Sequence, residues 1–376
     1  MIRIVHIITG LGSGGAENML YKLLKYSDKS KYYHEVISLM DEGVIGKRIR
    51  DEGVKIHSLN VSKANIFKSI LYARRICKDF DIINTWLYHA DLFGFVIAKL
   101  LLKKKLIWNI RHSNLDKNAN KSRTLMIVKI NSLLSKFVDY ITYNSNKAYE
   151  THKMNGYINN KYNIIPNGFE LDKFKFISSN RKETRAKLNI SNEEKVLITV
   201  GRWDIQKDYY TLFKAVNELA MKITDFKLLM VGTNLDYSNK ELLELVSKYN
   251  LMDNILLLGK RDDIPELLSA ADIYLSSSLG ESFSNAIGEA MACALPCIVT
   301  DVGDSRIMVD RFGAVVPPRN YLLMAEKIIN YINDDNLGRS FESRNRIINN
   351  YEIKKIVIEF EDKVYKNLLV GDKNEK

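Results

Sequence analysis

Two carboxylates, Glu281 and Glu289, stand on either side of a predicted helix start with seven residues between them. Glu281 follows the apolar segment 272–276, a predicted buried strand, and Glu289 lies about two helical turns on, roughly 10 Å at ~1.5 Å per residue. Ser282 or Ser284 can cap that helix, and the N–H groups of a helix start attract anions. Two acids flanking an anion site suit a ligand with hydroxyls at both ends and phosphate in the middle, such as a nucleotide sugar. The alternative is an ordinary strand, turn and helix with two surface acids.

Two cations, Arg202 and Lys207, come directly after another predicted strand, 195–200. At the carboxyl end of a parallel strand, such side chains face the region where α/β sheets bind ligands. An arginine can donate to two oxygens of a diphosphate and a lysine adds a point charge, and both stabilise the negative charge that grows when a nucleoside diphosphate departs. The alternative is that Lys207 begins an exposed helix while Arg202 forms a surface ion pair.

The loop 10–15, Gly-Leu-Gly-Ser-Gly-Gly, lies between the first predicted strand and a helix. It satisfies G-x-G-x-x-G, a pattern in which glycines let the backbone approach the phosphates of a dinucleotide. An NAD(P)-dependent dehydrogenase is therefore one interpretation. The ribose-binding acid that such a site needs about 20 residues farther on is poorly placed, because Glu35 begins a strand. The loop predicts a nearby phosphate without choosing between a dinucleotide and a nucleotide sugar.

Strand-like and helix-like segments alternate through both halves of the chain, which favours βαβ units and parallel sheets. The predicted strands are 2–8, 34–40, 54–58, 81–85, 105–111, 139–143, 162–165, 195–200, 226–231, 255–259, 272–276, 297–300 and 313–316. A Pro-Asn-Gly turn at 166–168 and a polar stretch to about Glu194 separate the two series. We therefore expect an α/β protein with two doubly wound domains, 1–168 and 169–340, facing each other across a cleft.

Length and composition favour a well-packed globular protein. The 376 residues suffice for two domains, and 46% apolar residues with only 5 prolines argue against disorder. The first residues run directly into a predicted strand, which argues against a signal peptide, and no apolar run approaches the ~20 residues of a spanning helix. Three cysteines suggest a reducing compartment rather than a disulfide framework. We expect a cytoplasmic protein.

The net charge of +11 is concentrated in the N-terminal half. Residues 1–165 carry 27 Lys and Arg against 13 Asp and Glu, a balance of +14, whereas 166–376 carry 29 against 32, a balance of −3. The asymmetry indicates an anionic partner for the first half: a membrane face, an anionic lipid-linked acceptor or nucleic acid. We expect no nucleic-acid partner, because no motif for one accompanies the basic residues. A general lysine bias of the genome is the alternative without a functional reason.

The run 280–304, with its Glu-x7-Glu spacing, resembles the signature of retaining glycosyltransferases of the group 1, or family 4, type that act in bacterial surface-polysaccharide synthesis. The segment 201–207 is similar to the Gly-Arg…Lys motif of the same family. The family often has glycine where this chain has Ser282 and Ala294, departures that leave both acids in place. The resemblance implies the GT-B fold, two Rossmann-like domains with the last helices, 341–376, crossing back to the first.

The resemblance also implies roles for matching residues. It assigns the donor diphosphate to two cations and two glycines: Arg202, Lys207, Gly14 and Gly15. It assigns the ribose hydroxyls to Glu289 and a hydroxyl of the sugar to Glu281. The remaining donor-side positions are Phe283, Ser284, Asn285 and, in the loop that borders the base, Arg261. Most relatives use UDP-sugars, so a UDP-sugar is the expected donor.

Arg111 and His112 mark the end of the predicted strand 105–111. The resemblance places His112 beside the donor sugar. His89 ends a neighbouring strand, and we expect it and Arg111 on the acceptor side. The alternative for each histidine is a hydrogen-bonded structural residue. The Asp-x-Asp sequence at 79–81 looks like the metal motif of another transferase fold, but it precedes its strand. We therefore expect no metal ion and no other cofactor.

These features together predict a retaining, metal-independent hexosyltransferase with a nucleotide-diphosphate donor and a saccharide hydroxyl as acceptor. The acceptor is expected to be lipid-linked, for example to undecaprenyl diphosphate, with the protein peripheral on an anionic membrane surface at the inner face. The helical stretches 66–78 and 121–137 mix apolar and basic residues and suit such a surface, or simply pack on their own sheet. A dehydrogenase and a nucleotide-sugar-binding subunit without catalytic activity are the alternatives.

Overall fold

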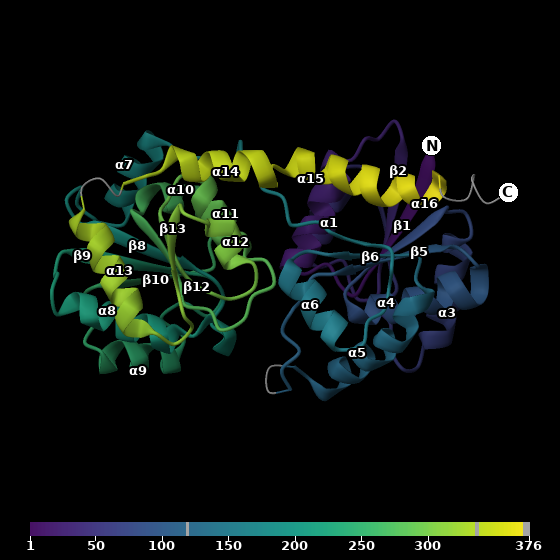
Figure 1. Cartoon of the computed structure of the whole chain (residues 1–376), viewed down its shortest axis with the longest axis horizontal. Coiled ribbons are helices and arrows are strands. Elements are labelled where there is room, and N and C mark those ends of the chain that lie inside the picture. The colour runs from purple at the N-terminus through teal and green to yellow at the C-terminus, as the bar shows by residue number, and fades with distance from the viewer. Residues whose placement is uncertain (118–119, 335–337, 371–376) are drawn as a thin grey trace. The chain divides into compact units, whose positions relative to one another are not determined.

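The structure is a computed structural model that describes residues 1–117, 120–334 and 338–370. The chain folds into two units (Figure 1). The N-terminal unit comprises Met1–Gly168 and Ile353–Lys376, and the C-terminal unit is Phe169–Glu352. Positions 371–376, the end of the segment expected to return to the first domain, lie outside the described residues.

The described residues of the N-terminal unit form a seven-stranded parallel sheet in the order β3-β2-β1-β4-β5-β6-β7. Its strands are β1 (Ile2–Ile8), β2 (Tyr32–Ser38), β3 (Lys55–Ser58), β4 (Ile82–Trp86), β5 (Lys105–Ile110), β6 (Tyr140–Tyr143) and β7 (Tyr162–Ile164). Its helices are α1 (Gly15–Tyr26), α2 (Gly43–Asp51), α3 (Ile66–Cys77), α4 (Tyr88–Phe95), η1 (Val96–Leu102), α5 (Ser122–Leu134), η2 (Ser135–Phe137), α6 (Asn146–Met154), α15 (Ile353–Phe360), η4 (Glu361–Lys366) and α16 (Asn367–Val370). Strands β4 and β5 are buried almost throughout, as in parallel sheets that are covered on both faces.

The described residues of the C-terminal unit form a six-stranded parallel sheet in the order β10-β9-β8-β11-β12-β13. Its strands are β8 (Lys195–Val200), β9 (Phe226–Val231), β10 (Ile255–Gly259), β11 (Ile273–Ser276), β12 (Cys297–Thr300) and β13 (Gly313–Val316). Its helices are α7 (Ser178–Lys187), η3 (Ile205–Lys207), α8 (Tyr209–Ala220), α9 (Lys240–Lys248), α10 (Ile264–Ala270), α11 (Asn285–Ala292), α12 (Ser305–Val309), α13 (Tyr321–Asn333) and α14 (Phe341–Tyr351).

The predicted α/β class with two doubly wound sheets is confirmed. Each predicted strand is present, and each begins and ends within two residues of its prediction. The agreement has a physical reason: a strand covered on both faces is a continuous apolar run, which polar turns delimit clearly. None of the described helices combines the length and apolar character that crossing a membrane requires.

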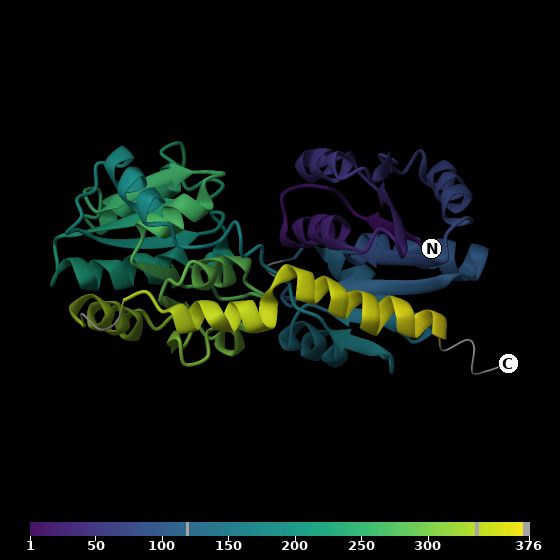
Figure 2. The ribbon, with the colours of Figure 1, turned by 90° about the horizontal axis from the view of Figure 1, so that it is seen from above.

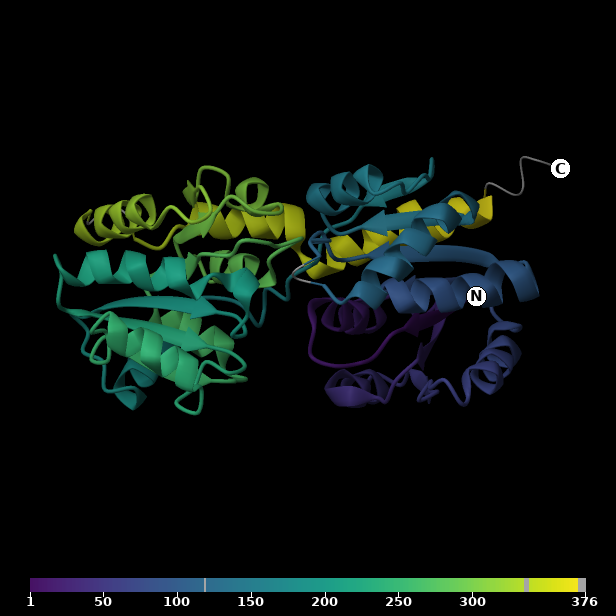
Figure 3. The same ribbon diagram turned by 90° about the horizontal axis from the view of Figure 1, so that it is seen from below.

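The last helices divide between the two units. Helix α14 packs on α11 in the C-terminal unit, where Ile347 is buried and Arg344 Nη1 donates to the carbonyl oxygen of Phe174 at 2.7 Å. The segment from Ile353 onward runs along the N-terminal sheet instead, and α15 packs on α1 (Figures 2 and 3). Residues 341–376 were expected to cross back to the first domain, and in the structure the division between the units falls between α14 and α15. The apolar face of α14 packs against α11 in the C-terminal unit, and the chain enters the N-terminal unit only after α14.

A chain of buried polar side chains crosses the N-terminal sheet beneath the returning segment. Trp86 Nε1 donates to His6 Nδ1 at 3.2 Å, so a neutral His6 has its proton on Nε2, which faces His34 Nδ1 at 2.9 Å. His34 Nε2 then donates to Ser27 Oγ at 2.8 Å, and the Ser27 hydroxyl donates to Glu361 Oε1 on η4 at 2.6 Å. This direction requires neutral imidazoles. Burial accordingly lowers the pKa of His34 to about 4 and that of His6 well below its usual value.

One buried cation ties α7 to the amino edge of the C-terminal sheet. The side chain of Arg185 is 1% exposed, and its Nη2 lies 2.8 Å from Asp272 Oδ2. Arg185 Nε also donates to the carbonyl oxygen of Ala270 at 3.0 Å, and Nη1 donates to that of Ser191 at 2.7 Å. Asp272 Oδ2 accepts from Val196 N at 2.8 Å as well. These bonds hold the beginnings of β8 and β11 side by side and so fix where the loops at their other ends emerge.

Each sheet reverses its strand order at one place, between β1 and β4 in the N-terminal unit and between β8 and β11 in the C-terminal unit. Loops that leave neighbouring carboxyl ends at such a point diverge and form the crevice in which open α/β sheets bind ligands. The loops after β8 and β11 carry the predicted cations and the first acid. The loops after β1 and β4 carry the glycine-rich stretch and His89.

Candidate functional site

Lys207 and Glu281 form an ion pair where the C-terminal sheet reverses its strand order. Lys207 Nζ donates to Glu281 Oε1, and the same oxygen accepts from Ser278 Oγ at 3.0 Å. The side chains are 24% and 15% exposed, so the pair is largely but not fully shielded from water. A predicted cation from the β8 loop and a predicted acid from the β11 loop therefore meet directly.

Hydrogen bonds between the two loops hold this pair in place. Ser277 Oγ donates to the carbonyl oxygen of Lys207 at 2.7 Å, and Leu279 N donates to that of Gln206 at 2.7 Å. Asp208, with φ of +46°, turns the chain from η3 into α8 and caps the first turn of α8 with its side chain. These hydrogen bonds fix the backbone that carries Lys207, both at the β11 loop and at the start of α8.

Arg202 lies in the same loop as Lys207 and extends toward solvent, its side chain 67% exposed. Its Nε donates to Asp204 Oδ2 at 2.9 Å. Burial alone would raise the pKa of Asp204, but hydrogen bonds from Gln206 N and the Arg202 guanidinium lower it below its usual value. No residue that the structure describes accepts from the Nη groups of Arg202, so these two donors are available to a diphosphate.

The backbone that carries Glu281 rests on the loop after β12. Asp304 N donates to the carbonyl oxygen of Ser282 at 3.3 Å. Gly303 has φ of +57°, and a Cβ there would lie 2.4 Å from the carbonyl oxygen of Glu281. Only glycine fits this close approach. The loop after β12 therefore packs directly against the backbone of Glu281 and fixes its position.

The predicted donor-side residues after Glu281 lead into α11. The side chain of Phe283 is buried and stacks on Phe169 with 6.1 Å between ring centroids, and the contact of its backbone with a donor stays a prediction. Ser284 is the N-cap residue and is 4% exposed, but its hydroxyl does not make the predicted hydrogen bond to the first turn. Asn285 is the first helical residue, and Glu289 lies in the second turn, partly exposed.

Arg261 pairs with Asp263 in its own loop after β10. Its Nε lies 2.8 Å from Asp263 Oδ1, and its Nη2 lies 2.5 Å from Oδ2. These side chains are 40% and 37% exposed, so the pair adds little to stability. Strand β9 separates β10 from β8, which puts Arg261 two strands away from Lys207 along the carboxyl edge. Its contact with a donor base stays a prediction.

The glycine-rich loop after β1 ends at the N-terminus of α1. Gly14 is the N-cap residue, and its carbonyl oxygen accepts from Asn18 N at 3.1 Å and from Asn18 Nδ2 at 2.9 Å. Gly15 begins the helix, and Glu17 stands in its first turn. Burial raises the pKa of Glu17 above its usual value. The contact of Gly14 and Gly15 with a diphosphate stays a prediction.

Arg111 lies at the carboxyl end of β5, over the ring of Trp86, with 5.0 Å from the guanidinium carbon to the ring centroid. Its Nη1 donates to Asn167 Oδ1 at 2.6 Å. Its Nε and Nη2 are buried and have no hydrogen-bond partner among the residues that the structure describes. Burial lowers the pKa of Arg111 to about 9. The guanidinium is therefore only partly satisfied, as expected of a group that completes its bonds with a ligand.

Both predicted histidines stand at the carboxyl edge of the N-terminal sheet, after β4 and β5. His112 lies edge-on to Tyr88, with 6.5 Å between ring centroids, and the Tyr88 hydroxyl is 2.8 Å from His152 Nε2. His89 is exposed at the start of α4, after Leu87, whose φ is +74°. The active-site role of His112 and the acceptor-side role of His89 stay predictions.

The described part of the chain holds no group of three or more His, Cys, Asp or Glu side chains that could bind a metal ion. The Asp-x-Asp sequence lies at the amino end of β4, where Asp81 Oδ2 accepts from Arg3 N at 2.8 Å. That carboxylate has a structural partner at the edge of the sheet remote from the switch point.

Sequence reasoning missed the polar groups that position the predicted residues. In the C-terminal unit these are Ser277, Ser278 and Asp204, which hold Lys207, Glu281 and Arg202 respectively. In the N-terminal unit they are Trp86 and Asn167, which flank Arg111. Three consecutive serines at the end of β11 were a usable signal, because hydroxyls at the end of a parallel strand lie beside the ligand crevice.

Two family models match consecutive parts of the chain. Glycosyltransferase Family 4 matches residues 13–173, and Glycosyl transferases group 1 matches residues 180–353. Together they span most of the sequence, and they meet close to the boundary between the two units.

Known proteins similar to this chain are glycosyltransferases and a related synthase. N-acetyl-alpha-D-glucosaminyl L-malate synthase of Bacillus anthracis is 30% identical over 235 residues, which are 61% of this chain and 59% of that relative. The UDP-Gal:alpha-D-GlcNAc-diphosphoundecaprenol alpha-1,3-galactosyltransferase of Escherichia coli is 26% identical over 321 residues, 83% of this chain and 82% of the relative. The crystal structure of Anabaena Alr3699/HepE in complex with UDP and glucose has a TM-score of 0.85 at 20% identity and covers 97% of this chain and 100% of that one. The chain therefore belongs to the group 1 and family 4 glycosyltransferases and has the GT-B fold.

Proposed function

We propose that the protein is a retaining glycosyltransferase that moves a sugar from a UDP-sugar to a hydroxyl of a saccharide acceptor. The ion pair of Lys207 and Glu281 at the switch point of the C-terminal sheet carries this proposal. It places a cation suited to the diphosphate beside an acid suited to a sugar hydroxyl. On this proposal the cation serves the diphosphate and the acid serves the sugar, the two parts of the donor that a glycosyl transfer separates.

The acceptor oxygen attacks the anomeric carbon from the face that the diphosphate leaves. The new glycosidic C–O bond forms as the bond from the anomeric carbon to the phosphate oxygen breaks, and that phosphate oxygen takes the acceptor's proton. Lys207 and Arg202 stabilise the charge on the departing UDP, and Glu281 holds the sugar. No enzymic nucleophile is needed, and the two cations serve in place of a divalent ion or another cofactor.

The remaining predicted residues complete the donor site on this proposal. Glu289 binds the ribose hydroxyls, Arg261 borders the base, and the backbone of Gly14 and Gly15 approaches the diphosphate. His112 lies beside the transferred sugar. Each of these roles is an expectation that a donor complex would test.

Release of UDP from a panel of UDP-sugars, with and without EDTA, tests the proposal. We expect release from at least one donor, faster with a saccharide acceptor and unchanged by EDTA. An inverted anomeric configuration in the product would refute retention, and loss of activity with EDTA would refute metal independence. Turnover of NAD(P)H alone would identify a dehydrogenase, and UDP binding without release would identify a non-catalytic subunit.

We further propose that the acceptor is a lipid-linked saccharide at the inner face of the plasma membrane. On α5 and η2, Met126, Ile130, Leu133 and Phe137 follow one another at intervals of four, three and four residues, and each is exposed. This spacing puts them on one helical face, which the basic Lys129 flanks. The similar Escherichia coli enzyme is named for a diphosphoundecaprenol-linked acceptor, which supports the same substrate class here.

Flotation with vesicles tests the membrane part. The full-length protein should float with vesicles rich in phosphatidylglycerol and less with neutral ones, and added salt should weaken the association. Leu133→Ser should reduce flotation while leaving UDP release unchanged. Equal behaviour with anionic and neutral vesicles would remove the proposal.

A further inference from the structure

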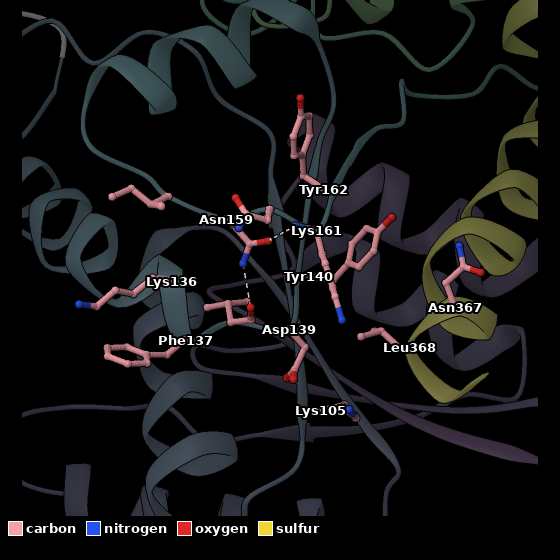
Figure 4. Close-up of a pocket in the computed structure, with 13 residues that line it drawn as sticks. Lys105, Lys136, Phe137, Asp139, Tyr140, Asn159, Lys161, Tyr162, Asn367 and Leu368 are labelled. Atoms are coloured by element: carbon pink, nitrogen blue, oxygen red, sulfur yellow. Dashed lines mark hydrogen bonds between the residues drawn. The ribbon is translucent and has the colours of Figure 1, made fainter. Parts of the chain in front are cut away.

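A pocket of about 670 Å³ lies in the N-terminal unit at the amino ends of β5, β6 and β7 (Figure 4). Because the strands are parallel, this edge is opposite to the carboxyl ends that carry Arg111, His89 and the glycine-rich loop. Asn367 and Leu368 of α16 form one wall. The volume falls within the range of small-molecule sites, roughly 300–1,000 Å³, and is far larger than a single ion needs. The pocket is therefore separate from the predicted transferase groups.

The lining of the pocket carries an excess of positive charge. Lys105, Lys136 and Lys161 line it, and Asp139 is the one acid among its described lining residues. The Asp139 carboxylate already accepts from Lys99 Nζ and, at 2.7 Å, from a backbone N–H of β5. Lys136 and Lys161 are exposed and form no ion pair with any residue that the structure describes. Their ammonium groups can donate to an anionic ligand.

Three aromatic side chains, Phe137, Tyr140 and Tyr162, also line the pocket, and Tyr140 is only 8% exposed. Tyr140 lies beside the side chain of Lys161 in the middle of Figure 4. Phe137 is 57% exposed, and Tyr162 is 37% exposed and braced by a neighbouring tyrosine ring at 4.4 Å between centroids. Asn159 fixes the turn between them, because its side chain donates to the carbonyl oxygen of residue 138 at 2.7 Å and accepts from Lys161 N at 2.8 Å. Stacking therefore restrains Tyr162, and the hydrogen bonds of Asn159 fix the turn beside it.

We propose that this pocket is a second binding site, for an anionic saccharide. Aromatic rings pack against the C–H faces of sugars, and lysines donate to the carboxylate, phosphate or sulfate groups that such a saccharide carries. A bare phosphate would leave the exposed faces of Phe137 and Tyr162 in water and most of the volume unfilled. The proposal does not depend on the transferase reaction, because the site lies at the opposite edge of the sheet.

Binding of a labelled oligosaccharide to the full-length protein tests this site. A fluorescein-labelled heparin hexasaccharide is titrated by fluorescence anisotropy, with neutral maltohexaose and tripolyphosphate as competitors. In the double variant Lys136→Gln/Lys161→Gln we expect the affinity to fall at least about tenfold, because two charge-assisted hydrogen bonds are lost. The matched control is Lys47→Gln/Lys68→Gln, which removes the same charge from exposed positions on α2 and α3 and should change affinity by less than about twofold, the screened effect of remote charges.

The outcomes separate the possible ligands. Tripolyphosphate should compete more weakly than unlabelled heparin hexasaccharide, and equal competition would show a bare-anion site and overturn the saccharide assignment. An equal loss of affinity in the control variant would show diffuse charge attraction and overturn the pocket itself. Failure to bind the hexasaccharide, together with vesicle flotation that depends on Lys136 and Lys161, would make the pocket a membrane contact instead. UDP release should be the same in all variants, so failure here and failure of the proposed function are distinguishable.

Discussion

Replacing Lys207 by methionine removes the ammonium that pairs with Glu281 and keeps most of the aliphatic stem. In the structure the pair lies at 24% and 15% side-chain exposure, where water screens it only in part. One charge-assisted hydrogen bond to a departing diphosphate contributes about 1.5–3 kcal/mol. We therefore expect kcat/KM for UDP release to fall by roughly 10- to 150-fold, since 1.36 kcal/mol corresponds to a factor of ten.

The same substitution leaves the Glu281 carboxylate with Ser278 Oγ at 3.0 Å and without its cation. Stability should then fall by about 1–3 kcal/mol, the cost of a partly buried acceptor that loses its partner. Glu281→Gln in the same chain removes the charge and should restore most of that stability. If the ion pair had only a structural role, the double variant Lys207→Met/Glu281→Gln would recover both its stability and its rate of UDP release. On our assignment the double variant recovers its stability but still releases UDP slowly.

Urea unfolding and initial rates of UDP release are measured on wild type, both single variants and the double variant. Lys227→Met is the matched control, because Lys227 pairs with Glu194 at 3.7 Å and the two side chains are 26% and 22% exposed. This pair has a similar burial but lies at the amino edge of the sheet, so its loss should leave kcat/KM within about twofold. A Lys207→Met protein as fast as wild type, or a double variant that regains full activity, would refute the reasoning.

Three further predictions concern stability. Gly288→Ala should destabilise by about 1–3 kcal/mol in urea unfolding, because its Cβ would lie 2.0 Å from Cζ of Phe169, and Phe169→Leu should recover most of the loss. The unfolded chain protonates His34 near pH 6.5 and the folded chain only near pH 4, so stability should fall by up to about 1.4 kcal/mol per pH unit as pH drops through that range. A Tm that stays level from pH 6.5 to 4 would contradict this. Arg185→Met should cost about 1–3 kcal/mol by chemical denaturation, because backbone carbonyl oxygens such as those of Ala270 and Ser191 lose a buried donor while Asp272 keeps its pair with Arg181 at 2.7 Å, and an unchanged midpoint would show that Arg185 is not needed.

The sequence predicted the strands and the loops that carry chemistry because both are local features. Buried parallel strands are apolar runs, and Arg202, Lys207 and Glu281 are recognisable as polar residues just past the ends of such runs. The contact between Lys207 and Glu281 could not be predicted in the same way. It depends on β8 and β11 being neighbours, which is a property of strand order, and on Ser277 joining their loops.

Helical periodicity likewise shows that a face is buried without naming its partner. Helix α14 and the segment from Ile353 onward both carry an apolar face, yet one packs in the C-terminal unit and the other on the N-terminal sheet. The burial of Arg185 could not be predicted from its local sequence either. In a helix rich in Arg and Lys it looks like a solvated residue, and only the fold shows that five nearby acceptors, four of them backbone carbonyls, enclose it.

On the proposed function, the Lys207–Glu281 pair affects how a donor binds. An arriving diphosphate would compete with Glu281 for the ammonium, while Ser278 Oγ stays bonded to the carboxylate. A hydroxyl of the transferred sugar would then take the place of the ammonium at Glu281, and UDP alone lacks that sugar. We therefore expect UDP to bind more weakly than the UDP-sugar, because UDP breaks the ion pair without replacing it.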